Sequence, residues 1–241
     1  MNLAIIVPTY NENENILELI KKIDQNLSVN NIDFKVFIVD DSNQNTILNL
    51  IKPFSDKINY HHRGKKLGRG SAVIEGINLA LKTKYTDLVI EMDADLSHDP
   101  TEMNDKIKIF VNDKLDLLIS SRYRKDSKIE GWTIQRTILS FVSNMMAKFL
   151  LKVPVTDYTN GYRLYSKKAA EYIVENCGKI GDGFIVLSEI LLELHYNNFK
   201  IGETFTTFKN REKGSSKVNL KLIFNSFLGL FKLFLIKMRK Y

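Results

Sequence analysis

Two aspartates separated by a single residue, Asp93 and Asp95, are the part of this sequence best suited to chemistry. They follow a short apolar run that predicts a strand, so both carboxylates can face one cleft from the turn that leaves it. Left without a counter-charge, the two carboxylates would repel each other, and the pKa of one of them would rise. A hard divalent cation removes this conflict, and Mg²⁺ in proteins usually takes one or two carboxylates together with substrate phosphate oxygens. The motif therefore predicts a metal site that a phosphate-bearing substrate completes.

Polar residues also follow three other predicted strands. The four polar segments are residues 8–12, 40–41, 93–95 and 120–123. Any one of them can be explained as a helix cap or a turn, where Asp, Asn and Ser are common. In an open parallel sheet, however, ligands bind outside the carboxyl ends of the strands. Several such segments at one edge therefore favour a binding cleft.

The elements that must position these residues alternate in the first half of the chain. We expect strands at 3–7, 34–39, 58–60, 87–92 and 115–120, with helices at 14–27, 46–51, 71–81 and 101–111. Buried-looking strands that alternate with helices predict an α/β fold, with a mostly parallel sheet and helices on both faces. In the second half we expect helices at 134–151, 166–176 and 184–196 and a strand at 204–208. No Pro-, Gly- or Ser-rich boundary divides the chain, so we expect one domain at 1–217 and an extension at 218–241.

Several residues leave two interpretations open. The glycine-bearing loop 64–70 is neither G-x-G-x-x-G nor a Walker A motif, and it can face an anion or remain a solvated loop. His98 suits a turn or a phosphate contact, and Asp157 suits an ion pair, a partner for Arg163 or a position near an acceptor. The stripe of Phe141, Met145, Met146 and Phe149 suits either the core or a lipid groove.

Charge and cysteine content exclude some classes of protein. The formal charge is +7, but residues 200–241 contain ten Lys and Arg and two acids, so residues 1–199 carry only −1. A nucleic-acid-binding role would need basic residues on the body of the protein, and we therefore expect no nucleic-acid partner. Cys177 is the single cysteine, which excludes an intrachain disulfide and fits a reducing compartment. No secretory signal and no uncharged apolar run of the ~18–20 residues of a spanning helix is apparent, so we expect a cytoplasmic protein.

Seven short motifs occur in order along the chain. They are VPTYNE at 7–12, VDDS at 39–42, KLGRG at 66–70, MDADLSH at 92–98, SRY at 121–123, GW at 131–132 and YRLY at 162–165. Together they resemble the inverting family 2 glycosyltransferases with a GT-A (Rossmann-like) fold, and within them the dolichol-phosphate mannosyltransferase, or polyprenyl-phosphate glycosyltransferase, group. The resemblance extends from residue 3 to about residue 217.

The resemblance implies a nucleotide-sugar site at the edge of the sheet. The residues expected to hold the base and the ribose are Pro8, Tyr10, Glu12, Val39 and Asp41. The diphosphate is expected to bind Asp93, Ala94 and Asp95 through Mg²⁺ or Mn²⁺, with Ser97 as the third residue of the metal set. Arg211 and Lys217 are expected to close over the diphosphate.

The same resemblance implies that Arg122, Arg136 and Ser140 receive the phosphate of an acceptor lipid. A hydroxyl acceptor needs a positioned general base, whereas a phosphomonoester with a second pKa near ~6 is already largely dianionic at pH 7. It needs cations to position it, and Arg suits planar, bidentate recognition of phosphate. We therefore take Asp95, Arg122 and Arg136 as the candidate catalytic residues.

The expected reaction is the inverting transfer of one hexose, mannose or glucose, from GDP-mannose or UDP-glucose to dolichyl or undecaprenyl phosphate. Two alternatives remain open at this point. The first is a family 2 enzyme that adds a sugar to a glycan hydroxyl, and the second is a non-catalytic, membrane-associated nucleotide-sugar-binding protein.

Residues 218–236 place Lys221, Asn225 and Lys232 along one narrow stripe of a predicted helix, and apolar residues cover the rest. The helix can pack on its own domain or lie in a membrane interface with its apolar face in the headgroup region. In the second case Lys237, Arg239 and Lys240 would meet anionic lipid. A lipid acceptor favours this case, so we expect peripheral association with the membrane surface.

Overall fold

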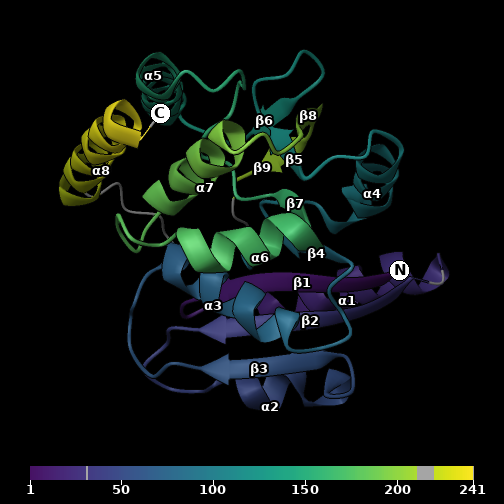
Figure 1. The fold of residues 1–241 in the computed structure, drawn as a ribbon. Helices are drawn as coiled ribbons and strands as arrows, with labels where there is room; N and C mark the ends of the chain where they lie inside the picture. The colour runs from purple at the N-terminus through teal and green to yellow at the C-terminus, as the bar shows by residue number, and fades with distance from the viewer. Residues whose placement is uncertain (31, 211–219, 241) are drawn as a thin grey trace.

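A computed structural model describes residues 1–30, 32–210 and 220–240 of the chain (Figure 1). Its main sheet has seven strands in the order β3-β2-β1-β4-β7-β5-β8. They are β1 (Asn2–Thr9), β2 (Asp33–Asp40), β3 (Ile58–His62), β4 (Leu88–Glu91), β5 (Leu117–Ser121), β7 (Arg163–Ser166) and β8 (Ile201–Phe205). Only β7 runs antiparallel to its neighbours in this sheet. The expected mostly parallel sheet is therefore confirmed.

Two differences from the expected strands occur in the second half. The expected strand at 204–208 is split at Thr206, because its Oγ1 donates to Glu102 over 2.6 Å and its N–H bonds to Ser127 Oγ. The chain then continues as β9 (Thr207–Lys209), which pairs in parallel with the unexpected short strand β6 (Lys128–Glu130). Strand β7 was not expected either, because its central position in the sheet depends on pairing with β4 and β5, which are distant in sequence.

Helices cover both faces of the sheet, as expected from the alternation of strands and helices. The helices are α1 (Ile16–Val29), α2 (Ile47–Ile51), α3 (Arg69–Leu81), α4 (Met103–Asn112), α5 (Ile134–Leu151), α6 (Lys167–Asn176), α7 (Ile185–Tyr196) and α8 (Leu220–Lys240), with short 3₁₀ turns η1 (Lys52–Phe54) and η2 (Pro100–Glu102). Figure 1 shows α3 and α6 in front of the sheet and α1 behind it.

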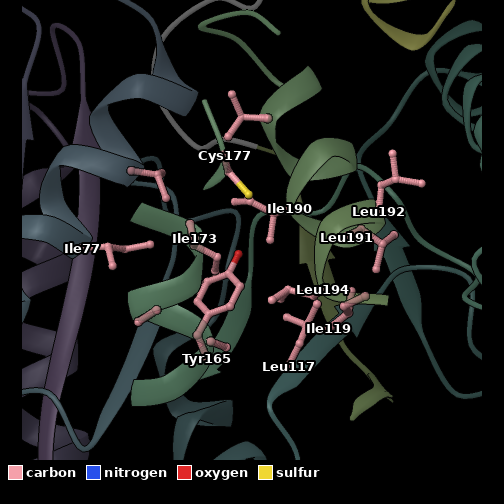
Figure 2. Close-up of a cluster of buried hydrophobic side chains, with 14 of the residues drawn as sticks. Ile77, Leu117, Ile119, Tyr165, Ile173, Cys177, Ile190, Leu191, Leu192 and Leu194 are labelled. Carbon is pink, nitrogen blue, oxygen red and sulfur yellow. The ribbon is translucent and has the colours of Figure 1, made fainter. Parts of the chain in front are cut away.

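The core lies in two layers, one on each face of the sheet. The first layer packs against α1 and α4, and the second packs against α3, α6 and α7. Along β1, Leu3, Ile5 and Val7 pack with α1 and α4, whereas Ile6 packs with α3, because neighbouring strand residues point to opposite faces. Figure 2 shows part of the second layer, where β5, α6 and α7 contribute buried aliphatic side chains and β7 contributes Tyr165. Cys177 lies near Ile190 in this layer, and burial raises the pKa of its thiol well above its ordinary value.

Helix α8 packs against α5 and α7. Its Leu230 and Leu233 belong to the second core layer, and Lys240 Nζ forms an ion pair with Glu193 of α7 over 2.7 Å. The inner side of this helix therefore packs on the protein. Its outer side carries exposed apolar residues, Leu228, Phe231, Leu235 and Met238.

The stripe on α5 is also exposed. Phe149 exposes 79% of its surface, and Phe141, Met145 and Met146 are exposed as well, so the interpretation of this stripe as core is wrong. Among the described residues, no helix is both long enough and apolar enough to cross a lipid bilayer.

Helix α3 approaches β1 closely at Gly76. A Cβ atom on Gly76 would lie 2.5 Å from Cγ2 of Ile6, whereas a Cβ on Gly183 would have no atom within 4 Å. We expect Gly76→Ala to lower the free energy of unfolding by about 1–3 kcal/mol through overpacking, measured by urea denaturation. Gly183→Ala is the matched control, and an equal loss in both variants would contradict this packing argument.

Candidate functional site

A cavity of about 310 Å³ lies at the ends of β4 and β5, between these strands and the helices α5, α7 and α8. Its polar lining includes six residues that the sequence analysis singled out: Asp93, Asp95, Ser97, Arg122, Arg136 and Ser140. Its apolar lining comes mainly from the helices and includes Leu139, Ala147, Ile185, Phe227 and Leu230. The cavity therefore joins acidic, basic and apolar walls in one space.

The acidic wall forms where the chain leaves β4. Leu96 has a φ of +63°, and the tight turn there lets the backbone N–H of Ser97 donate to Asp95 Oδ1 over 3.1 Å. Ser97 Oγ is buried and makes no hydrogen bond within the described part of the chain. A buried hydroxyl oxygen beside two carboxylates fits the oxygen ligands that Mg²⁺ and Mn²⁺ prefer.

No group of three or more His, Cys, Asp or Glu side chains that could hold a metal occurs among the described residues. A cation at this wall would therefore draw on Asp93, Asp95, Ser97 and oxygen atoms of a ligand. That arrangement matches the expected use of Mg²⁺, which commonly keeps substrate phosphates in its shell.

Arg69 stands directly behind the acidic wall. Its side chain is 13% exposed and forms ion pairs with Glu91 over 2.6 Å and Asp93 over 2.7 Å. Burial alone would lower the pKa of Arg69, but the charges of Asp93 and Glu91 raise it above its ordinary value. The sequence suggested that loop 64–70 faces a bound anion or remains solvated. Arg69 does neither, because its side chain faces the protein's own carboxylates.

Two glycines make this position of Arg69 available. Gly68 has a φ of +103°, and α3 begins directly after it, at Arg69. A Cβ atom on Gly161 would lie 1.9 Å from Arg69 Nη2, so any larger residue at 161 would displace the Arg69 side chain from this position.

Arg122 forms the centre of the basic wall. Its Nε and Nη2 each donate to the buried carboxylate of Asp157 over 2.8 Å, and Nη2 also donates to Thr159 Oγ1 over 2.6 Å. Asp157 therefore forms an ion pair, as one interpretation of the sequence had it, but its partner is Arg122. Arg163 is instead buried and donates to the backbone oxygens of Tyr158, Asn160 and Leu187.

The ion pair also fixes the charge of Asp157. Burial alone would raise the pKa of this carboxyl, but the charge of Arg122 and the hydrogen bonds from Arg122 and Thr159 lower it below its ordinary value. The guanidinium of Arg122 is thus held in one orientation by a charged partner.

Trp132 brings the second arginine to the same wall. The guanidinium carbon of Arg136 lies 4.3 Å from the centre of the Trp132 ring, and that of Arg122 lies 5.3 Å from it. Thr133 caps α5 by accepting from the N–H of Arg136, so Arg136 sits in the first turn. Ser140 lies one turn later on the same helix face, where its Oγ bonds to the hydroxyl of Tyr123 over 2.7 Å.

His98 is 1% exposed and is not among the residues that line the cavity. Its Nδ1 accepts from the N–H of Asp93 over 3.0 Å, and its Nε2 bonds to Asn160 Oδ1 over 2.9 Å. Burial is the main cause that lowers the pKa of His98. The side chain is therefore held by the protein, and a direct phosphate contact by His98 does not fit this position.

The residues expected to hold the nucleotide lie at the ends of β1 and β2 and outside the cavity lining. Pro8 and Val39 are buried in these strands, and Tyr10 is exposed with Lys66 Nζ 4.3 Å from its ring centre. Glu12 accepts from the amide of Asn15 over 2.8 Å.

Asp41 is buried, and both of its carboxylate oxygens accept hydrogen bonds from the protein itself. Its Oδ1 accepts from Arg63 Nε over 2.6 Å, and its Oδ2 accepts from the N–H groups of Leu67 and Gly68 over 2.9 and 2.8 Å. In this arrangement Asp41 holds loop 64–70 in place.

Arg211 and Lys217 lie outside the described residues. Asn210, the last described residue before them, accepts from Arg136 Nη1 over 2.8 Å. Sequence reasoning missed Arg69, Trp132, Thr159 and Asn160 as parts of this site. Only Arg69 and Trp132 stood in recognised motifs, and the contacts of Arg69, Thr159 and Asn160 join residues that are distant in sequence.

The chain is similar to known proteins in sequence. The family model described as Glycosyl transferase family 2 matches residues 4–174. A dolichol-phosphate mannosyltransferase from Pyrococcus furiosus is 32% identical over 237 residues, which are 97% of this chain but only 64% of that protein. A polyprenol monophosphomannose synthase from Mycolicibacterium smegmatis is 32% identical over 221 residues, 89% of this chain and 80% of that protein.

Solved structures support the fold. Glucosyl-3-phosphoglycerate synthase from Mycobacterium tuberculosis, crystallised with Mn²⁺, UDP and phosphoglyceric acid, aligns with a TM-score of 0.68. The alignment covers 98% of this chain and 78% of that chain at 16% sequence identity. This likeness confirms the expected architecture.

The Arg122–Asp157 pair predicts a stability effect with a defined pH dependence. We expect Asp157→Asn to lower the free energy of unfolding at pH 7 by about 3 kcal/mol, because it leaves a buried guanidinium without its counter-charge. The lowered pKa of Asp157 means that its contribution is complete above the unfolded value of about 3.9 and is lost as the pH falls further. Urea denaturation from pH 7 to pH 3 should show the deficit shrink below about pH 4. The control Asp126→Asn lies on an exposed loop, and a similar deficit there would contradict the assignment.

Proposed function

Because the chain belongs to glycosyl transferase family 2 and is a glycosyltransferase, we propose that it transfers one hexose from a nucleotide-sugar to a polyprenyl phosphate. The observation that carries this proposal is a cavity that combines a carboxylate pair at one wall, two arginines at another and apolar helices beside them. A soluble sugar acceptor would not need the apolar walls, and a lipid alcohol would not need the two arginines.

The acidic wall suits the diphosphate of the donor. Asp93, Asp95 and the Ser97 hydroxyl would hold Mg²⁺ or Mn²⁺, which supplies positive charge to the leaving diphosphate when it is bound. Arg69 keeps Asp93 in place from behind, through the ion pair of 2.7 Å. Arg211 and Lys217 are proposed to add positive charge to the same diphosphate, and Pro8, Tyr10, Glu12, Val39 and Asp41 are proposed to form the base and ribose site.

The basic wall suits the phosphate of the acceptor. A phosphomonoester dianion needs no general base, so the protein only has to position it for attack on the anomeric carbon. Arg122 is held by Asp157 through Nε and Nη2, and this pair also fixes the direction of Nη1. Arg136 and Ser140 reach the same wall from α5. Attack from the side opposite the diphosphate inverts the anomeric carbon, so an α-linked donor gives a β-linked product.

The names of the relatives favour mannose as the sugar, since both are described by mannose transfer. We therefore propose GDP-mannose as the donor, with UDP-glucose as the second donor to test. Dolichyl and undecaprenyl phosphates both offer the phosphate and the prenyl chain that the cavity would recognise.

The outer faces of α5 and α8 suit the membrane surface in which such an acceptor resides. Their exposed apolar residues are Ile134, Ile138, Phe141, Val142, Met145, Met146 and Phe149 on α5 and Leu228, Phe231, Leu235 and Met238 on α8. Of the cations expected to meet anionic lipid, Lys237 is instead buried and donates to the backbone oxygen of Leu150, and Lys240 is paired with Glu193. Arg239 is exposed, as are Lys148 and Lys232 on the same two helices, and these three would meet anionic headgroups. An apolar helix face with flanking cations is the composition of an interfacial helix.

The direct test is transfer of labelled hexose by the purified full chain. We expect product from a labelled nucleotide-sugar and polyprenyl phosphate with Mg²⁺ or Mn²⁺, no product from the unphosphorylated polyprenol, and recovery of activity when metal is added back after chelation. Asp95→Asn should lower kcat/KM by about 10²-fold or more, because the leaving group loses its charge stabilisation. Asp126→Asn is the control. Transfer to a glycan hydroxyl in place of the phosphate would overturn the proposal in favour of the first alternative.

Membrane contact is tested with vesicles that contain anionic lipid. We expect the full chain to bind them, and the double variant Ile138→Ser and Phe149→Ser to bind about tenfold or more weakly, because both side chains are exposed and apolar. Val111→Ser, an exposed apolar position on α4, is the matched control. Unchanged binding of the double variant in a sedimentation assay would show that α5 does not enter the interface.

A further inference from the structure

The acidic and basic walls of the cavity are joined by a buried chain of hydrogen bonds. The N–H of Asp93 donates to His98 Nδ1 over 3.0 Å, and His98 Nε2 bonds to Asn160 Oδ1 over 2.9 Å. The N–H of Asn160 then donates to Asp157 Oδ1 over 3.0 Å, and Asp157 holds Arg122. The chain therefore runs from the metal motif to the arginine expected at the acceptor phosphate.

The polar atoms of this chain admit one arrangement of hydrogens. Because Nδ1 of His98 accepts a backbone N–H, its proton is on Nε2, and that N–H must donate to the amide oxygen of Asn160. The amide nitrogen of Asn160 then donates to the backbone oxygen of Ser120, at the end of β5. Each donor in this chain of hydrogen bonds has its acceptor, so the hydrogen atoms cannot be arranged in a second way.

Burial makes this chain stiff. His98, Asn160 and Asp157 are at most 2% exposed, so water cannot replace their hydrogen bonds. Rings also pack on His98, with Tyr162 stacked at a centroid distance of 5.1 Å and Phe208 edge-on at 5.5 Å. Asn160 is therefore tied to the loop after β4, to the end of β5 and to the loop before β7.

We propose that His98 and Asn160 are positioning residues that fix the acidic wall relative to Arg122, so that the donor and the acceptor phosphate are held in register for transfer. This inference rests on the proposed function for the identity of the two ligands. His98 does not line the cavity, and Asn160, which does, is proposed to act through its hydrogen bonds to His98 and Asp157. Breaking the chain should leave each wall able to bind its own ligand but should misplace one ligand relative to the other.

Two variants break the chain at its central link. His98→Asn keeps an oxygen near the place of Nδ1, so the N–H of Asp93 remains paired, but it loses the bond to Asn160. Asn160→Ala removes the same link from the other side. Tyr162→Phe is the matched control, because it removes a buried hydrogen bond to the Asp99 backbone of 3.1 Å and keeps the ring that stacks on His98.

We expect both variants to lower kcat by about 10- to 100-fold, since small misplacements of reacting groups have effects of this size. The Kd of Mg²⁺ with the nucleoside diphosphate, and the Kd of a short prenyl phosphate, should each stay within about threefold by calorimetry. The double variant should lose no more than the more severe single variant, because both act on one link. Tyr162→Phe should keep its kcat within about threefold. Additive losses, or an equal loss in the control, would overturn the proposal.

A second measurement separates this proposal from the proposed function. If the wild-type protein transfers no sugar, the proposed function is wrong. The positioning role of the hydrogen bonds is then tested by binding alone. The Kd of the prenyl phosphate should then change by about fivefold or more when Mg²⁺ and nucleoside diphosphate are present, and this change should vanish in His98→Asn and Asn160→Ala. A wild-type Kd that does not respond to the nucleotide would overturn the positioning role.

Discussion

The structure around the cavity depends on how buried charges are kept apart and compensated. Asp93 has to stay beside Asp95, and Arg122 has to stay near Arg136, although like charges repel in each pair. Each wall meets this demand with one opposite charge, the largely buried Arg69 behind Asp93 and the fully buried Asp157 behind Arg122. Removing Asp157 would leave the nearly buried guanidinium of Arg122 without its counter-charge, and removing Arg69 would leave Asp93 beside Asp95 and Glu91 with less compensation. Other features, such as the glycine at 161, follow from making room for these partners.

The compensating residues explain where sequence reasoning succeeds and where it ends. The alternation of strands and helices predicted the parallel part of the sheet, and the spacing of Asp93 and Asp95 predicted the acidic wall, because both are local patterns. The partners Arg69 and Asp157 could not be assigned, since they reach their carboxylate and guanidinium across 24 and 35 residues. Likewise β7 owes its place to strands on both sides, so four residues of sequence were not sufficient to predict it.

The C-terminal helix α8 has one buried side and one exposed side. From sequence alone, packing on the domain and contact with a membrane were alternatives for the same residues. In the structure Leu230 and Leu233 are buried against the domain, while Phe231 and Met238 are exposed on the other side of α8, so packing does not compete with the proposed membrane contact. Composition does not show which side of such a helix packs on the protein, because the helix is apolar on nearly all sides. Its inner side closes part of the cavity, which brings the lining at Leu230 next to the outer apolar surface.

Strand β7 acts as a spacer between the two charged walls. It separates β4 from β5, so Asp93 and Arg122 leave strands that are about 9–10 Å apart, twice the usual strand spacing. On adjacent strands these opposite charges would pair with each other directly and would neutralise both walls. Its reversed direction also makes the loop at 157–161 enter at the same edge, where it supplies Asp157 to Arg122. One inserted strand thereby keeps the carboxylates and the guanidinium from pairing with each other, as the proposed binding of two phosphate-bearing ligands requires.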